Sequence, residues 1–191
     1  MRTVRLFMTM SCDGFFGGPG GELDWMAAAP DLELNQDIVD LIGQSDTAFM
    51  GYPVASGMIP YWQQVAANPA AAEGERAIAD AVRRVHSLVL STTEVEFTLD
   101  NAELLVVRDD AGLRDAVNAV KRQPGRDIGV PGGIRTARAF VRLGLIDEYV
   151  LMVHPAALGE GQRVFTQRTD LSLQSAKAYQ SGVTRLTYRP R

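Results

Sequence analysis

The chain has 191 residues and a formal net charge of −4, with 46% hydrophobic and 22% charged residues. This composition is ordinary for a globular protein, and we expect one domain spanning residues 1–191. No stretch concentrates Lys or Arg, which argues against nucleic acid as a partner. The single cysteine, Cys12, excludes an internal disulfide and a multi-thiolate metal site. Because neither an 18-residue apolar run nor a signal-peptide pattern occurs, we expect a cytoplasmic protein without membrane contact.

The N-terminal part of the chain is predicted to contain a strand, a long loop, and then alternating helices and strands. Residues 3–10 form a nearly continuous apolar run, typical of a strand buried in a parallel sheet. Residues 11–25 contain five glycines and a proline, so we expect a loop long enough to be functional. A helix over 33–43 and a strand over 46–50 are predicted next. Residues 55–72, with Gly57, Pro60, Pro69 and an alanine run, predict a short helix and then an irregular excursion.

The rest of the chain is predicted to alternate helices and strands and to end with strands only. The predicted helices cover 73–85, 110–122 (with Asp110 as its cap) and 134–144, and the predicted strands cover 86–91, 104–107, 127–130 and 149–153. Residues 171–179 and 183–189 alternate as strands around a Gln-Ser-Gly turn, which indicates a hairpin. We therefore predict an α/β fold with a mostly parallel central sheet, flanked by helices and finished by a C-terminal antiparallel hairpin.

A Gly-Gly pair follows one of the predicted strands and leads directly into a helix. The segment is Val-Pro-Gly-Gly over residues 130–133. Glycine allows close backbone approach, and a helix N-terminus carries partial positive charge, so this order suits a bound phosphate. A tight turn without a ligand explains the same residues equally well.

Few side chains in the sequence suggest acid–base or metal chemistry. The two histidines, His86 and His154, adjoin apolar strands without a metal-ligand spacing, so we expect no metal. Asp13, Asp24 and Asp31 lie in or just after the first loop, close to Trp25. Each could be a turn or cap residue. Taken together, they place carboxylates and an aromatic ring where an α/β fold builds its site.

Several segments, in order, resemble one known family. They are Ser-Cys-Asp-Gly-Phe-Phe (11–16), Asp-Thr-Ala-Phe-Met-Gly (46–51), Val-Leu-Ser-Thr (89–92), Val-Pro-Gly-Gly (130–133), the run from Asp147 to Gly161, and Ser181 to Pro190. Together they span nearly the whole chain. The chain resembles the dihydrofolate reductase superfamily, most closely its riboflavin-biosynthesis branch, the reductase domain of the bifunctional deaminase-reductase. The zinc-binding deaminase half has no counterpart, which implies a stand-alone reductase-like protein.

The resemblance implies a dihydrofolate-reductase-like fold, a homodimer, and NADPH as cofactor for a small-molecule substrate. The pyrophosphate would rest on Gly132-Gly133, with Ile134, Arg135 and Thr136 starting the helix. The matching cofactor positions after the second and third strands are Gly51, Tyr52, Val54, Ser91 and Thr92. Loop 11–25 would close over nicotinamide and substrate, with Trp25 against the substrate. Asp31 would be the acid, with Asp13 as the alternative proton donor.

Two departures from the family pattern bear on the cofactor. The family has Gly-Arg-x-Thr after the second strand, whereas this chain has Gly51-Tyr52-Pro53-Val54. Where the family often has Ser-Arg, this chain has Ser91-Thr92. Arginine normally recognises the ribose 2′-phosphate of NADPH, so NADH is an alternative cofactor.

The main functional hypothesis is hydride transfer from NAD(P)H to a C=N or carbonyl carbon of a small heterocyclic or sugar-linked substrate. This activity resembles that of 5-amino-6-(5-phosphoribosylamino)uracil reductase. The alternatives are a dihydrofolate or pterin reductase and a non-catalytic binding protein that lost its cofactor. A different reduced cofactor, such as a deazaflavin, also stays open.

Overall fold

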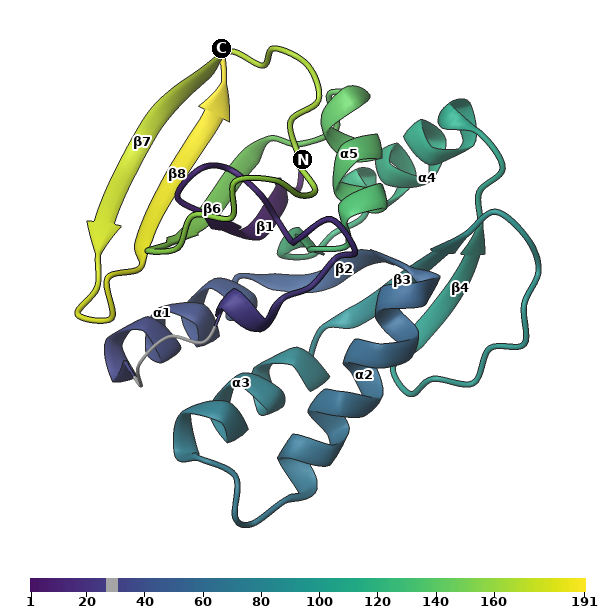
Figure 1. Cartoon of the computed structure of the whole chain (residues 1–191). Coiled ribbons are helices and arrows are strands. Elements are labelled where there is room, and N and C mark those ends of the chain that lie inside the picture. Colours follow the sequence, from purple (N-terminus) through teal and green to yellow (C-terminus); the bar gives the residue numbers. More distant parts are fainter. Residues whose placement is uncertain (27–30) are drawn as a thin grey trace. The chain divides into compact units, whose positions relative to one another are not determined.

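The computed structural model describes residues 1–26 and 31–191. Figure 1 shows its helices and strands along the chain. They form two compact units, each built from separate stretches of sequence. Unit 1 comprises residues 1–3 and 32–129, and unit 2 comprises residues 4–31 and 130–191.

Unit 1 holds parallel strands in the order β4-β3-β2-β5. The strands are β2 (Ser45–Gly51), β3 (His86–Ser91), β4 (Ala102–Val106) and β5 (Asp127–Pro131), whose last two residues belong to unit 2. The helices are α1 (Leu32–Gly43), α2 (Tyr52–Ala67), α3 (Glu73–Arg83) and α4 (Asp110–Arg122). Because the strands are parallel, their carboxyl ends lie at one edge of this sheet, the usual location of α/β ligand sites.

Helix α2 differs from the expectation for residues 55–72. It is a continuous helix of 16 residues with Pro60 inside it. Ala55 and Ile59 are buried with Val89 in one apolar cluster, and this burial outweighs the weak helix propensity of the segment. The carbonyl of Ser56, which loses its helical partner at Pro60, belongs to an exposed residue that water can reach.

Helix α4 has the predicted bounds but a different cap. Its N-cap is Asp109, whose side chain accepts a hydrogen bond from the amide of Gly112 (2.8 Å). The prediction that Asp110 caps the helix was therefore wrong by one residue. Asp110 lies in the first turn, where its negative charge still favours the helix.

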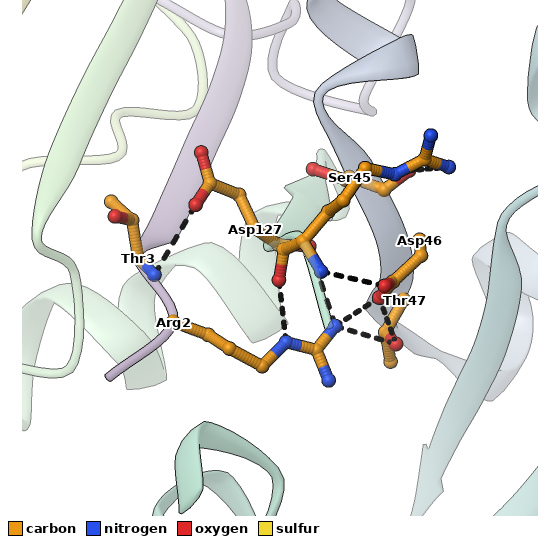
Figure 2. Close-up of polar contacts among 7 residues, drawn as sticks. Arg2, Thr3, Ser45, Asp46, Thr47 and Asp127 are labelled. Atoms are coloured by element: carbon orange, nitrogen blue, oxygen red, sulfur yellow. Dashed lines mark hydrogen bonds and ion pairs between the residues drawn. The ribbon is translucent and has the colours of Figure 1, made fainter. Parts of the chain in front are cut away.

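A polar network ties the first residues of the chain to β2 and β5 (Figure 2). The guanidinium of Arg2, only 5% exposed, pairs with Asp46 and donates to the hydroxyl of Thr47 (2.8 Å). The amide of Arg126 donates to the second oxygen of Asp46 (2.7 Å). Burial alone would raise the pKa of Asp46, but the Arg126 amide, the Thr47 hydroxyl and the two guanidinium charges lower it below its ordinary value.

Unit 2 combines one parallel pair with an antiparallel hairpin. Strand β1 (Val4–Ser11) runs parallel to β6 (Glu148–His154), and β6 pairs antiparallel with β8 (Thr184–Pro190), which pairs with β7 (Leu171–Ala178). Helix α5 (Ile134–Arg142) and the short 3-10 helix η1 (Asp24–Met26) complete it. The predicted mixture of parallel strands, helices and a C-terminal hairpin is confirmed.

Within residues 1–26 and 31–191, no helix has the length and apolar character needed to cross a membrane. The same part of the chain contains no group of three or more His, Cys, Asp or Glu side chains arranged to hold a metal ion.

Candidate functional site

The Gly132-Gly133 turn presents an open helix terminus in unit 2. Both glycines have positive φ, 80° and 81°, a conformation that side chains with a Cβ rarely adopt. Gly133 is the N-cap of α5, and no side chain caps the helix there. A Cβ at Gly132 would meet no atom within 4 Å. The amide of Gly132 donates to the carbonyl of Val130 (3.1 Å), so the N–H groups that the turn offers to an anion are those from Gly133 into the first turn of α5, at the positive end of the helix.

Two arginines on α5 differ in their availability to such an anion. The Nε of Arg138 donates to the carbonyl of Arg163 (2.8 Å), so this side chain is directed to the loop after β6. Arg135 is exposed and makes no hydrogen bond or ion pair with any described residue. Ile134 and Thr136, which flank it, are half-buried. Among the described residues, Arg135 is the cation without such a contact that is nearest in sequence to the Gly-Gly turn.

Asp13 fastens the first loop to the loop after β6. Its carboxylate accepts hydrogen bonds from the Ser11 hydroxyl (2.6 Å) and from the amides of Gly159 (2.8 Å) and Leu158 (3.1 Å). These donors, Ser11 first, lower the pKa of Asp13 to about 2. An acid with that pKa is ionised at neutral pH and cannot donate a proton. The environment favours a positioning role for Asp13.

The same two loops contact each other through their backbones. The amide of Cys12 donates to the carbonyl of Ala156 (2.8 Å). The amide of Gln162 donates to the carbonyl of Gly17 (2.8 Å), and the amide of Phe16 donates to the carbonyl of Gln162 (2.7 Å). A Cβ on Gly161 would lie 2.2 Å from the carbonyl oxygen of Gly17, so glycine is required there. The first loop is thus anchored at several points rather than hanging free from β1.

Trp25 lies against a histidine whose proximity was not predicted. Its ring meets that of His154 edge-on, with 5.7 Å between centroids, and its Nε1 donates to the carbonyl of Glu22 (3.1 Å). His154 ends β6 opposite Ser11, the last residue of β1, in the parallel register. Burial lowers the pKa of His154, which keeps the imidazole neutral at pH 7. The position of His154 at a strand end was the only sequence signal for this pair.

Asp31 contacts the turn of the C-terminal hairpin. The residue is 8% exposed, and its Oδ2 accepts a hydrogen bond from the amide of Ser181 (2.9 Å). It comes directly before α1 in the sequence. Nothing in the sequence pattern indicated that the hairpin turn would contact this carboxylate.

The remaining predicted cofactor residues lie in unit 1, at the carboxyl ends of β2 and β3. Gly51 pairs with Leu90, so Gly51-Tyr52 and Ser91-Thr92 share one edge. Gly51 is the N-cap of α2 without a side-chain cap, and Pro53 removes one N–H from the first turn. Val54 is half-buried, and the Ser91 hydroxyl is bonded to the carbonyl of Thr93 (2.7 Å). These residues offer fewer phosphate donors than the usual family pattern.

The predicted residues thus fall into two groups. Unit 1 brings together the positions after β2 and β3. Unit 2 contains the Gly-Gly turn, both candidate acids and Trp25.

Comparison with known proteins identifies the family to which this chain is similar. The sequence model described as "RibD C-terminal domain" matches residues 2–185. An uncharacterised protein, YyaP, from Bacillus subtilis (strain 168) is 30% identical over 190 residues, covering 98% of this chain and 94% of that protein.

Solved structures show the same fold at lower identity. A putative riboflavin biosynthesis protein from Shewanella sp. PV-4 has a TM-score of 0.74, 19% identity and 99% coverage of both chains. A diaminohydroxyphosphoribosylaminopyrimidine deaminase/5-amino-6-(5-phosphoribosylamino)uracil reductase from Thermotoga maritima has a TM-score of 0.69 at 12% identity. All of this chain is covered there, but only 57% of the Thermotoga chain.

The fold and the Gly-Gly terminus define the class: an α/β protein with largely parallel strands and a C-terminal antiparallel hairpin, as in the reductase part of riboflavin-biosynthesis enzymes. The chain belongs to the RibD C-terminal domain family. The resemblance inferred from the ordered motifs is therefore confirmed.

Proposed function

We propose that this protein is an NAD(P)H-dependent reductase that transfers hydride to a C=N or carbonyl carbon of a small heterocyclic or sugar-linked substrate. The observation that carries the proposal is the Gly132-Gly133 turn, with two positive-φ glycines before an uncapped helix. Family membership supports the same activity class. The name of the Thermotoga protein includes 5-amino-6-(5-phosphoribosylamino)uracil reductase, and a substrate of that kind is part of the proposal.

The residues of the turn suit a dinucleotide. The amides of Gly133 and of the first turn of α5 would hold the pyrophosphate, Gly132 would allow it to approach closely, and the exposed Arg135 adds a cation. Bound NAD(P)H would supply the hydride. In unit 1, Tyr52 and Thr92 stand where the usual family pattern has arginines. NADPH is therefore proposed as the cofactor, with NADH as the alternative.

Substrate positioning and protonation fall to the first loop and the residues after it. Trp25 offers an aromatic face held by His154, and the loop anchored by Asp13 excludes water. Of the two carboxylates, only Asp31 is proposed as the proton donor, because the Asp13 carboxylate has a pKa of about 2. Asp31→Asn is expected to lower kcat by 10²-fold or more, as for loss of a general acid, and to leave cofactor binding unchanged.

A cofactor titration tests the proposal. NADPH and NADH are added while the fluorescence of Trp25 and Trp62 is followed in the parent chain and in Gly132→Ala. Gly132→Ala is expected to lose at least tenfold in affinity, because the Cβ strains the turn and fills the space beside the amides. Gly144→Ala is the matched control, since Gly144 also has positive φ (65°) and open space but follows the other end of α5.

Binding of neither nucleotide to the parent chain would reject the cofactor proposal and favour a non-catalytic binding protein. Activity assays with dihydrofolate and with the aminouracil ribosyl phosphate then separate the two reductase alternatives. A homodimer and a cytoplasmic location complete the proposal, and light scattering of the purified chain tests the dimer.

A further inference from the structure

Unit 1 contains a cavity of about 420 Å³ that none of the residues discussed above as cofactor contacts lines. Its apolar walls are Ile59 and Trp62 of α2 and Val82 and Val85 around the end of α3. Ser87, near the start of β3, also borders it. Ser87 is four residues from Ser91, or roughly 13 Å along the strand. The cavity therefore lies toward the amino ends of the strands, away from the edge with Gly51 and Ser91.

The Trp62 ring forms an oriented aromatic wall. It is half-buried, and Tyr61 packs edge-on against it, with 5.0 Å between ring centroids and an interplanar angle of 72°. An aromatic ring at the cavity wall provides a flat surface on which a planar ligand can stack.

Ser87 provides a polar group without a partner at the cavity. The residue is only 6% exposed, and its hydroxyl makes no hydrogen bond to any residue that the structure describes. The Ser87 hydroxyl is not among the fully buried polar atoms that lack a partner in the described part of the chain, so it is in contact with solvent at the cavity. A polar ligand atom in the cavity can replace that solvent contact with a direct hydrogen bond.

The rim of the cavity carries opposite charges that balance. Arg83 carries a positive charge and Asp100 a negative charge, and both residues are exposed. Gln63 donates to Asp100 through a long bond of 3.4 Å, which a ligand can replace at little cost. Asn101, with φ of 52°, already donates to the carbonyls of Arg83 and Val85 (3.1 Å each) and holds this rim in place. A neutral ligand with donors and acceptors on its edge matches this arrangement.

We propose that this cavity is a second binding site, which takes a neutral nitrogen-containing aromatic ring system of one or two rings. The ring stacks on Trp62, and its polar edge bonds to Ser87 and to the Gln63–Asp100 side of the rim. The volume is within the range of small-molecule sites. The proposal does not depend on the reductase function, since the cavity is built by unit 1 alone.

The test uses lumazine, a neutral bicyclic heteroaromatic compound, as the probe. Trp25→Phe leaves Trp62 as the only tryptophan of the chain, so quenching of its fluorescence reports on the cavity. Saturable quenching is expected. In the same background, Ser87→Ala is expected to weaken binding about fivefold to tenfold without lowering the melting temperature, because the hydroxyl has no partner in the free protein.

A blocking variant and its control complete the test. Ala67, exposed at the end of α2, lines the cavity, and Ala67→Phe is expected to abolish the quenching. Ala70→Phe changes an exposed alanine that does not line it and should bind like its parent. If Trp25→Phe does not fold, amide shifts of Ser87 and Asn101 in the unmodified chain replace fluorescence. No saturable binding, or equal binding by Ala67→Phe and Ala70→Phe, overturns the proposal.

Discussion

Two aspartates of similar sequence context, Asp13 and Asp24, have different surroundings in the structure. Both lie in the glycine-rich first loop. The Asp13 carboxylate accepts hydrogen bonds from Ser11 and from two amides of the loop after β6, whereas Asp24 is exposed. The donors at Asp13 belong to residues nearly 150 positions away, apart from Ser11. Its role could therefore be assigned only from the tertiary structure.

The lowered pKa of Asp13 makes stability depend on pH in a defined direction. The folded-state pKa of about 2 lies below the ordinary value, so ionised Asp13 stabilises the fold above about pH 4. This contribution is lost as the pH falls from about 4 toward 2. Asp13→Asn should unfold at lower urea concentration than the parent at pH 7, and the difference should shrink by pH 3. Asp24→Asn serves as the control, and an undiminished difference at pH 3 would contradict the assignment.

Tyr52 and Val54 stand where the family has an arginine and a threonine, and these positions bear on cofactor preference. The double variant Tyr52→Arg/Val54→Thr restores the usual pattern beside Gly51 at the N-terminus of α2. We expect it to increase the preference for NADPH over NADH by about tenfold, because a charge-assisted bond to the 2′-phosphate contributes ~1.5–3 kcal/mol. Parallel NADPH and NADH titrations measure the ratio. An unchanged ratio would mean that the 2′-phosphate does not reach Tyr52.

At the scale of elements, α2 shows how packing overrides local propensity. Gly57 and Pro60 are both unfavourable in a helix interior. The helix nevertheless continues through them, because Ala55 and Ile59 are buried with residues of β2 and β3. The local sequence pattern, which contains Gly57 and Pro60, gives no information about the stabilising contacts that β2 and β3 make with this helix.

Gly57, in the interior of α2, is a position where an added side chain should stabilise the helix. A Cβ at Gly57 would meet no atom within 4 Å, so Gly57→Ala should raise the free energy of unfolding by about 0.5–1 kcal/mol. Gly74→Ala in α3 is the contrasting variant, since its Cβ would lie 2.5 Å from the Nδ2 of Asn35 and should gain less. Urea denaturation of both variants measures the difference. Destabilisation by Gly57→Ala would show that α2 tolerates no added side chain there.

At the scale of the whole molecule, each compact unit is assembled from segments distant in sequence. The chain passes from one unit to the other after Thr3, Asp31 and Gly129. The last crossing falls inside β5, which begins in unit 1 and ends at the Gly-Gly turn of unit 2. The short first segment of unit 1 is bound by the Arg2 side chain and by a hydrogen bond from the amide of Ile128 to the carbonyl of Thr3 (2.8 Å).

Removing the Arg2 guanidinium should weaken the molecule more than removing a surface ion pair. Arg2→Met removes the buried guanidinium that pairs with Asp46, leaves the more distant charge of Arg126, and should lower the free energy of unfolding by about 2 kcal/mol. This is less than for a fully buried pair, because the Asp46 side chain is 34% exposed. The loss should diminish at acid pH, since the pKa of Asp46 lies below its ordinary value and protonation removes the charge.

Arg168→Met is the matched control for Arg2→Met. Arg168 pairs with Asp170 at 3.0 Å, but the two side chains are 86% and 58% exposed. Its removal should change the free energy of unfolding by less than about 1 kcal/mol. Equal effects of the two substitutions in urea denaturation would indicate that burial of Arg2 contributes nothing.

Most of the secondary structure was determined by the sequence alone, because buried strands, amphipathic helices and Gly turns leave local patterns. The Gly132-Gly133 turn belongs to this group: positive φ at consecutive glycines before a helix is a local property. The family segments, which keep their order along the chain, also predicted the class of protein from the sequence alone.

Only the tertiary structure decided which donors surround each carboxylate and which faces bury each helix. Neighbours from other elements determine the hydrogen bonds of the Asp13 carboxylate, the Trp25–His154 pair, the contact of Asp31 with Ser181 and the place of Ser87 at the cavity. Hydrogen bonding, desolvation and cavity formation are set by residues that meet in space. A pattern along one chain segment contains no information about such distant partners.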